Sequence, residues 1–450
     1  MCFLPTGYTC RQFFCDIFKK ENRLKNGGTG MEKNVKYEIL HTIEGKNVKF
    51  IQLQFVDAFG ILKNITVMSK KAEYVLEGKY RIDGYSVLGR NKASFYLKPD
   101  PDTFTILPWC FQQEKTARFL CDLTDEQGRD VKESSRFILK NILRKAEEKG
   151  YRFQINAECE FSVLETDHAG KATINTKERA KDLDCDSIEN EVISVLEEMG
   201  IETMAAYRGS IPAQHKINLE PSWGIQSMDN IITLRAAVKN IAKQYGRYAT
   251  FMPKPGVDFP GNSMILSFLV YKDGKDIFSN KNAENGISQQ AYSFIAGLLV
   301  HMNGMTAIAN PVVNSYKRLR SDSGHSPELF WSVSDFQAPL CVLKEKDGTV
   351  RIQWRIPDGA ANPYVLVAAA VEAGLQGIEE RMIPLKSGEK AGYLPETLKE
   401  AVAEFEKDEL LRTVYGDSYV KRYVEEKCKE WKQYQIQITE WEREEYLNQF

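Results

Sequence analysis

The segment Ala157-Glu158-Cys159-Glu160-Phe161 sets two carboxylates two residues apart in a stretch with strand character. Residues two apart in a β-strand point to the same face, so Glu158 and Glu160 are expected to lie side by side. Two such charges repel each other, and a fold tolerates them when a metal ion, a lysine or an arginine stands against them. The identity of this counter-charge therefore decides what the segment can do.

The composition is that of an ordinary globular protein. The chain has 450 residues, of which 43% are hydrophobic and 27% charged, which suits two domains or one large one. A formal net charge of -2 offers no basic stripe for a nucleic acid. No uninterrupted apolar run reaches the roughly 18 residues of a membrane span. We therefore expect neither a nucleic-acid nor a membrane partner, and a cytoplasmic location.

The cysteines and histidines are scattered. Nine cysteines and five histidines form none of the close pairs that bind zinc, and the odd number of cysteines indicates reduced thiols. Residues 1–30 differ in composition from the rest of the chain, and we expect them to be a disordered extension ahead of Met31. A signal peptide is the alternative, although polar residues interrupt its apolar stretch.

Hydrophobic periodicity predicts two domains. Alternating apolar residues indicate a small, strand-rich domain over residues 31–130, with strands expected over 48–55, 61–67, 95–100 and 104–109. Helices and strands alternate through the second domain, residues 131–450. Its amphipathic helices are expected from Ser134 or Ser135 to Gly150, and over 186–199, 229–245, 363–373 and the charged tail 398–450.

Motifs spread over both domains match one protein family. They include Ile82-Asp83-Gly84-Tyr85-Ser86, Pro99-Asp100-Pro101-Asp102-Thr103-Phe104, Glu158-Cys159-Glu160-Phe161, Asn314-Ser315-Tyr316-Lys317-Arg318-Leu319 and Pro357-Asp358-Gly359-Ala360-Ala361-Asn362-Pro363-Tyr364. On these motifs the chain, from Val48 to Phe450, resembles the bacterial type I glutamine synthetases.

The resemblance implies an α+β fold. An N-terminal β-grasp domain would precede a catalytic domain with a curved antiparallel sheet flanked by helices. It also implies a ring-shaped homo-oligomer, such as a dodecamer, whose adjacent subunits complete each active site. The family reaction ligates ammonia to glutamate with ATP, while Mg or Mn offsets the phosphate charge. ATP and Mg or Mn are thus the implied cofactors, and glutamate, glutamine or a nucleotide the implied ligands.

The metal ligands of the family are only partly present. Glu158 and Glu160 match its paired glutamates, but the other ligand positions hold Gly209, Lys216, Ile265 and Gln353. Glycine and isoleucine supply no ligand atom, and a lysine ammonium repels a cation. We expect Lys216 to pair with both glutamates and to replace the metal's charge, leaving a vestigial site.

Other family positions are lost or kept. Two arginine positions hold Phe336 and Cys341, and the catalytic glutamate of the flap is missing from Gly324-His325-Ser326-Pro327. The resemblance keeps Asp83 as the catalytic acid on the ammonium side, and Gly261, Arg318 and Arg355 as substrate-binding residues.

Alternatives remain open for several of these residues. A single weakly bound metal or a working two-metal site competes with Lys216 pairing, and a register slip would bring Glu202 or Glu220 into the site. Arg318 and Arg355 either cradle an anion or brace the sheet, and Asp83 either acts as an acid or only forms a turn. Candidate bases or structural residues are His215 and His325; Cys159 and Cys341 are expected to be packing residues.

Two functions are compatible with the sequence. The first is a catalytically impaired member of the glutamine synthetase family, a pseudoenzyme that acts by binding a ligand, by assembling, or by mixing with an active paralogue. The second is an active divergent glutamine synthetase or another ATP-dependent carboxylate-amine ligase.

Overall fold

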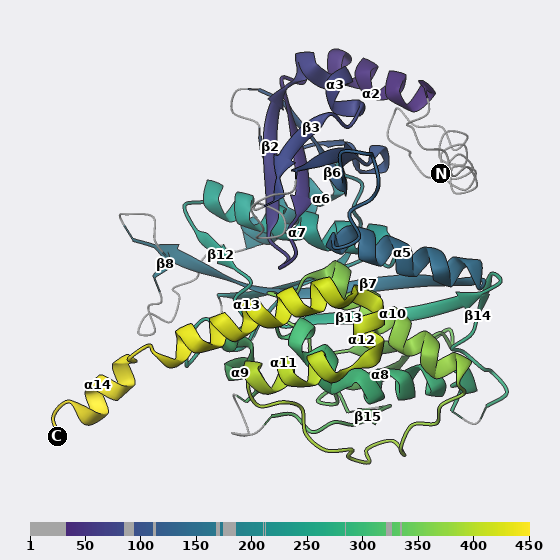
Figure 1. Ribbon diagram of the computed structural model, residues 1–450, viewed down its shortest axis with the longest axis vertical. Coiled ribbons are helices and arrows are strands. Elements are labelled where there is room, and N and C mark those ends of the chain that lie inside the picture. Colours follow the sequence, from purple (N-terminus) through teal and green to yellow (C-terminus); the bar gives the residue numbers. More distant parts are fainter. Residues whose placement is uncertain are drawn as a thin grey trace.

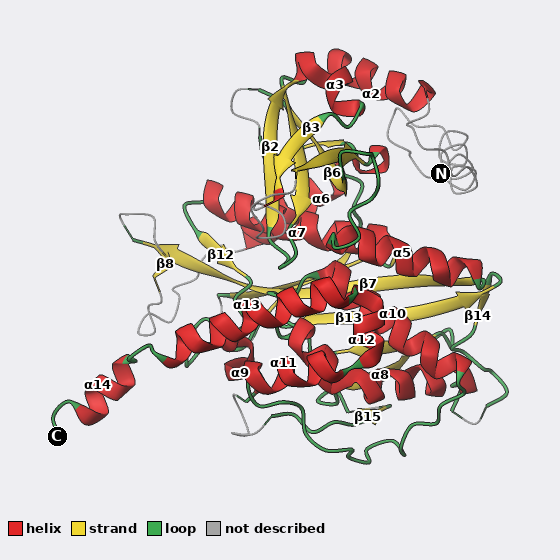
Figure 2. Cartoon of the chain, viewed as in Figure 1, coloured by secondary structure: helices red, strands yellow, loops and turns green. Residues whose placement is uncertain are grey.

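The α+β fold predicted for the chain is confirmed by the computed structural model, in which a small sheet domain stands over a larger domain (Figures 1 and 2). The structure describes residues 33–84, 94–110, 114–167, 172–173, 186–209, 211, 213–283, 285–320, 326–333 and 335–450. The extension predicted for residues 1–30 and the flap position His325 lie outside the described residues.

The N-terminal domain packs two helices against one sheet. Its strand order is β2-β1-β6-β4-β3, with β5 on β6, and only β1 and β6 among these pairs run parallel. The elements are α2 (Lys33–Gly45), β1 (Phe50–Val56), β2 (Leu62–Met68), η1 (Ser69–Lys71), α3 (Ala72–Leu76), β3 (Tyr80–Asp83), β4 (Ser94–Pro99), η2 (Pro101–Thr103), β5 (Thr105–Ile106) and β6 (Thr116–Thr124).

The predicted strands of this domain are confirmed with one correction. The expected strands over 48–55, 61–67 and 95–100 appear as β1, β2 and β4. The strand expected over 104–109 is wrong beyond Ile106, because Pro108 has no N–H with which to continue a ladder. Alternate residues of β1, such as Ile51 and Leu53, are completely buried in a cluster with α2 and α3.

The C-terminal domain is built on a large, mainly antiparallel sheet with the order β15-β16-β17-β13-β7-β10-β9. Short strands β8, β11 and β12 pair with β7, and β14 pairs with β13. The strands are β7 (Tyr151–Thr166), β8 (Ala172–Thr173), β9 (Thr203–Arg208), β10 (Gln214–Leu219), β11 (Ser222–Trp223), β12 (Tyr248–Thr250), β13 (Met264–Lys272), β14 (Lys275–Asp276), β15 (Trp331–Ser332), β16 (Leu340–Lys344) and β17 (Val350–Trp354).

Helices cover one face of this sheet and continue into a C-terminal tail, whose last helix, α14, projects from the body of the domain (Figure 1). The central helices α8 and α10 are buried along most of their length. The helices are α5 (Ser135–Glu148), α6 (Asp186–Glu198), α7 (Ile225–Gln244), α8 (Gln289–Ala309), α9 (Val313–Leu319), α10 (Pro363–Glu379), α11 (Leu398–Lys407), α12 (Glu409–Tyr415), α13 (Asp417–Gln435) and α14 (Glu440–Tyr446).

Helix α7 begins four residues before the expected start at Asp229. Gly224 adopts a φ of 53°, which turns the chain directly from β11 into the helix. Asp229 consequently lies inside the helix and is buried, where it accepts hydrogen bonds from Arg136. The charged residue that looked like a helix start is an interior ion-pair partner.

The two domains meet at a buried ionic cluster around Arg136 on α5. Its guanidinium donates to Asp100 and Asp122 of the N-terminal domain, at 2.8 and 2.6 Å, and to Asp229 of α7 at 2.8 Å. Lys140 donates to the same two N-terminal aspartates, at 2.9 and 2.6 Å. This cluster joins the small domain to the large one.

One described helix, α8, satisfies the length and composition of a membrane span, although it holds no uninterrupted apolar run of that length. Gln, Ser, His, Asn and Gly residues interrupt the apolar run of α8, so a search for uninterrupted runs misses it. Because 72% of its most apolar window is buried inside the protein, α8 is a core helix.

A half-buried histidine links three helices of the large domain. His301 on α8 lies with Nδ1 2.8 Å from Asp408 Oδ2 and with Nε2 2.8 Å from Gln376 Oε1. Gln376 Nε2 donates to Glu380, which orients its oxygen toward the ring. Burial alone would lower the pKa of His301, but the hydrogen bond and charge of Asp408 outweigh it and raise that pKa.

The raised pKa makes the stability of this junction depend on pH. A protonated His301 donates from both nitrogens, so its contribution is complete below the unfolded pKa of about 6.5 and is lost as the pH rises through the folded pKa. We expect His301→Gln to lower the free energy of unfolding by about 1 kcal/mol near pH 6 and by less above pH 8. Urea unfolding across this range measures it, with exposed His41→Gln as control. A loss that does not vary with pH would contradict the protonated state.

Candidate functional site

The candidate site is the face of the large sheet that points away from its main core. Alternate residues of β7, among them Ala157, Cys159 and Phe161, are buried in that core. Glu158 and Glu160 point to the opposite side, as the two-residue period predicts. We call this side the polar face; it carries Asn156, Glu158, Glu160, Lys216, Asn218, Ile265, Ser267 and Gln353.

Lys216 bridges the two glutamates. The register of β10 on β7 sets Lys216 opposite Glu160, and Asn218 opposite Glu158. The ammonium nitrogen of Lys216 lies 3.3 Å from Glu158 Oε2 and 3.3 Å from Glu160 Oε1. The three side chains are 18 to 26% exposed, so water screens this cluster less than an ion pair on the open surface. The counter-charge of the pair in this structure is a lysine.

Ser263 engages the remaining oxygen of Glu160. Its backbone N–H and its hydroxyl donate to Glu160 Oε2 at 2.8 and 2.6 Å. Both carboxylate oxygens of Glu160 thus have partners within the protein. Sequence reasoning missed this role, because Ser263 reaches Glu160 only through the packing of the segment before β13 against β7.

Two of the positions that the resemblance aligns with metal ligands are closed by apolar or tight packing. Ile265 stands opposite Glu158 in the β13–β7 register and is only 4% exposed. A Cβ atom on Gly209 would fall 2.2 Å from Gln214 Oε1, so any side chain there requires Gln214 to move. Gln214 is itself held, since its Nε2 donates to Gly261 O at 2.9 Å. Neither Ile265 nor Gly209 has a side-chain oxygen to offer a cation.

Amide and hydroxyl groups hydrogen-bond to one another across the polar face. Gln353 Nε2 donates to Ser267 Oγ at 3.1 Å, and Gln353 Oε1 accepts from Arg355 Nη1 at 2.8 Å. On the neighbouring strands, Asn156 Nδ2 donates to Asn218 Oδ1 at 2.9 Å. The side-chain oxygen of Gln353, which the motif resemblance aligns with a metal ligand, is therefore already used.

Arg318 packs against Gly261 beside this face. A Cβ atom on Gly261 would fall 2.3 Å from Arg318 Cγ, so the absence of a side chain on Gly261 leaves room for Arg318. Arg318 Nη2 donates to the carbonyl of Ile356, and its buried Nε has no hydrogen-bond partner. Burial lowers the pKa of Arg318, while the charges of Asp358 and Glu160 oppose this shift.

Arg355 also bonds within the protein. Its Nε donates to the carbonyl of Phe336 at 2.7 Å, and its guanidinium lies 5.5 Å from the centre of that ring. Both of the retained arginines donate to backbone carbonyls here, which is the contact expected of residues that brace the sheet. Phe336, which the motif resemblance aligns with an arginine, is 59% exposed.

Asp83 belongs to the other sheet. It ends β3, pairs with Ser94 and is exposed on the N-terminal domain, whereas the polar face belongs to the C-terminal domain. Its assignment as a catalytic acid stays a prediction.

The remaining candidates lie in or near the core. His215 points to the face of β10 opposite Lys216, where its Nδ1 lies 2.7 Å from Glu189 Oε1 and its ring stacks on Phe161. Burial raises the pKa of Cys159 to about 12 and also raises that of Cys341, so both thiols stay protonated at neutral pH. These contacts are those of structural residues.

The residues of the polar face do not fit the divalent metals of the resemblance. Among the residues that the structure describes, no group of three or more histidine, cysteine, aspartate or glutamate side chains is placed to hold a metal ion. The N–H of Glu220 donates to the carbonyl of Glu202 at 3.0 Å, beyond the bulge in the β10–β9 ladder at Asn218 and Leu219. The register therefore keeps Lys216, rather than either of these glutamates, against Glu158 and Glu160.

A β-grasp sheet joined to a large sheet whose face carries paired glutamates defines a class of ligase-like proteins. A model described as "Glutamine synthetase, beta-Grasp domain" matches residues 47–126, and one described as "Glutamine synthetase, catalytic domain" matches residues 132–446. The chain belongs to the glutamine synthetase family, as its motifs predicted.

The relatives match over nearly their full length. The chain is 35% identical over 443 residues to a glutamine synthetase of Clostridium saccharobutylicum, covering 93% of this chain and 100% of the relative. It is 33% identical to that of Thermus thermophilus, over 92 and 98% of the two chains. Among solved structures it is similar to GmaS without ligand, with a TM-score of 0.82 and 27% identity over 91% of this chain and 99% of that one. A GmaS/ADP complex has a TM-score of 0.81, 28% identity and the same coverage.

Proposed function

We propose that this protein is a pseudoenzyme of the glutamine synthetase family, in which Lys216 has replaced the metal at the polar face. The observation that carries the proposal is the position of the Lys216 ammonium, 3.3 Å from each of two glutamate carboxylates. Phosphoryl transfer depends on divalent ions that bridge and neutralise the phosphate oxygens. A single ammonium already held by two carboxylates has no charge left for that task.

The work of the protein is then binding or assembly. Glutamate, glutamine or a nucleotide is the proposed ligand, and Arg318, Arg355 and the backbone at Gly261 would supply its contacts. A ring-shaped homo-oligomer, such as a dodecamer, would bring Asp83 of one subunit toward the polar face of the next, and an active paralogue could share the ring. A cytoplasmic location belongs to the same proposal. So does a boundary between the two domains at residues 130 and 131.

An active divergent ligase is the second candidate. The identity of 35% over the whole length of a curated glutamine synthetase supports it, as does the similarity to GmaS solved with ADP. ATP with Mg or Mn would be its cofactors, although the polar face would have to rearrange to admit the metal.

Phosphate release separates the two candidates. The protein is incubated with ATP, glutamate and ammonia in Mg or Mn, beside Thermus thermophilus glutamine synthetase as a positive control. We expect no glutamate-dependent phosphate release, because the charge that stabilises the transferred phosphoryl group is missing. Glutamate-dependent turnover that rises with enzyme concentration would contradict the pseudoenzyme proposal and support the divergent ligase.

Ligand binding is measured on the same preparation. A ligand that binds the folded protein raises its melting temperature, so glutamate, glutamine and ATP are added singly, with and without Mg. We expect a rise with at least one of them that does not depend on Mg. A rise that appears only in Mg would instead indicate that the metal enters the site.

A further inference from the structure

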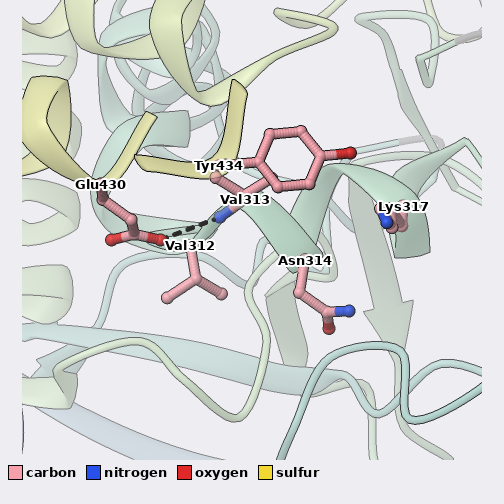
Figure 3. A pocket seen from close by; sticks show the side chains of 6 residues that line it. All are labelled: Val312, Val313, Asn314, Lys317, Glu430 and Tyr434. Carbon is pink, nitrogen blue, oxygen red and sulfur yellow. Dashed lines mark hydrogen bonds between the residues drawn. The ribbon is translucent and has the colours of Figure 1, made fainter. Parts of the chain in front are cut away.

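A cavity lies on the surface where helix α9 meets the end of α13, away from the strands of the polar face. Its volume is about 340 Å³, which is at the small end of ligand pockets. Figure 3 shows the side chains that line it, which are Val312, Val313, Asn314, Lys317, Glu430 and Tyr434. We call it the α9–α13 cavity.

Two of the polar groups in this cavity are already engaged. Glu430 accepts from the N–H of Val313 at 3.1 Å (Figure 3). It also accepts from the ammonium of the buried Lys427 at 2.9 Å, so its charge is balanced. The amide of Asn314 accepts from the N–H of Lys254 at 2.7 Å and donates to its carbonyl at 3.0 Å. Neither side chain is available as the main contact of a ligand.

Lys317 and Tyr434 retain unused hydrogen-bonding capacity. The Lys317 ammonium lies 5.3 Å from the centre of the Tyr434 ring, and no carboxylate of the described residues forms an ion pair with it. The Tyr434 side chain is 36% exposed. Val313 and Val312, the latter next to Glu430 in Figure 3, contribute apolar surface to the lining. The cavity thus offers one cation and one phenol hydroxyl next to a hydrocarbon wall.

We propose that the α9–α13 cavity binds a small carboxylate with an apolar body. The carboxylate would accept from the Lys317 ammonium and the Tyr434 hydroxyl, and the hydrocarbon would cover Val312 and Val313. A polyanion such as a nucleotide fits less well, because it would place several negative charges against the single ammonium of Lys317. The site is separate from the proposed function and does not depend on it.

The helix that forms this cavity also reaches the polar face. Arg318, the residue after Lys317, packs on Gly261, while Asn314 holds Lys254 in the segment that leads to Gly261. A ligand in the cavity would therefore contact the helix that positions Arg318.

Calorimetric titration with a matched pair of carboxylates tests the proposal. Leucine and 4-methylpentanoate share a carbon skeleton and differ in the amino group, and 4-methylpentan-1-ol lacks the charge. We expect at least one carboxylate to bind and the alcohol to bind at least tenfold more weakly. Stronger binding of leucine would support a carboxylate site in which the amino group reaches Glu430, and stronger binding of 4-methylpentanoate one that excludes the amino group.

Variants locate the site. Lys317→Met keeps the aliphatic stem and removes the charge, and we expect it to weaken carboxylate binding at least tenfold, with Tyr434→Phe weakening it about threefold. Lys421→Met, which removes an exposed lysine of α13 outside the cavity lining, should leave the affinity unchanged. No binding of either carboxylate, or an affinity that Lys317→Met does not alter, would overturn the proposal. Lys317 is exposed, so its variant is expected to fold.

Discussion

Lys216→Glu is expected to turn the polar face from a site closed by a lysine into one that binds Mn²⁺. The substitution puts three carboxylates where the structure has two carboxylates and the ammonium that lies 3.3 Å from both. Three neighbouring carboxylates repel one another in the absence of metal and supply hard oxygen ligands in its presence. The variant should therefore be less stable than the native protein in EDTA and should regain stability with Mn²⁺.

The expected size depends on the partial burial of the cluster. Breaking a fully buried ion pair costs about 3–5 kcal/mol, and exposure of 18 to 26% reduces this to about 1–3 kcal/mol. Mn²⁺ at a hundredfold excess over its dissociation constant would restore about 2.7 kcal/mol. Thermal and urea unfolding in EDTA and in Mn²⁺ measure both effects.

Lys216→Met is the matched control. It removes the ammonium without adding a ligand, so it should lose stability in EDTA and recover little of it in Mn²⁺. If the native protein gains as much stability from Mn²⁺ as Lys216→Glu does, Lys216 does not close the site.

Arg136→Met is expected to give the largest loss of stability that the structure predicts. Its guanidinium, 5% exposed, is the common partner of Asp100, Asp122 and Asp229. Removing it leaves buried carboxylates with too little positive charge, which costs about 3–5 kcal/mol. Urea unfolding measures the loss. Arg144→Met is the control on the same helix, because the ion pair of Arg144 with Glu148 is exposed and should contribute little.

The same cluster predicts a response to acid. Burial alone would raise the pKa of Asp100 and Asp122, but the charges of Arg136 and Lys140 outweigh it and hold both below their usual value. Groups with a lowered folded pKa stabilise the protein fully above the unfolded value of about 3.9 and lose this contribution as the pH falls through the folded pKa. The difference in unfolding free energy between the native protein and Arg136→Met should therefore shrink below about pH 4. A constant difference would contradict the charge of the cluster.

Local sequence patterns predicted which helices and strands exist more accurately than the residues at which they begin and end. The two-residue period correctly assigned Glu158 and Glu160 to one face of a strand, because side-chain alternation is a property of the strand itself. The start of α7 was wrong by four residues, since a buried Asp229 inside a helix looks in sequence like a residue that begins one. Its partner Arg136 is 93 residues away in the chain, and a local sequence pattern cannot reveal a contact between residues so far apart.

At the polar face, too, the sequence predicted which residues are present and the packing decided their contacts. Its ligand positions Gly209, Lys216, Ile265 and Gln353 came from a resemblance between motifs, which carries no coordinates. Whether Lys216 points toward the glutamates depends on the register of β10 on β7, and the role of Ser263 depends on how β13 packs beside it. A slip of one residue would have turned Lys216 to the other side.

The sequence by itself determined the family, the two sheets and the presence of two carboxylates on one strand face, because motifs and short periods are properties of neighbouring residues. Only the tertiary structure decided which charged group lies against that pair. Strands from separate parts of the chain bring Lys216 to 3.3 Å from both glutamates and Ser263 to the second oxygen of Glu160. Contacts of this kind are fixed by register and packing, which depend on the whole fold.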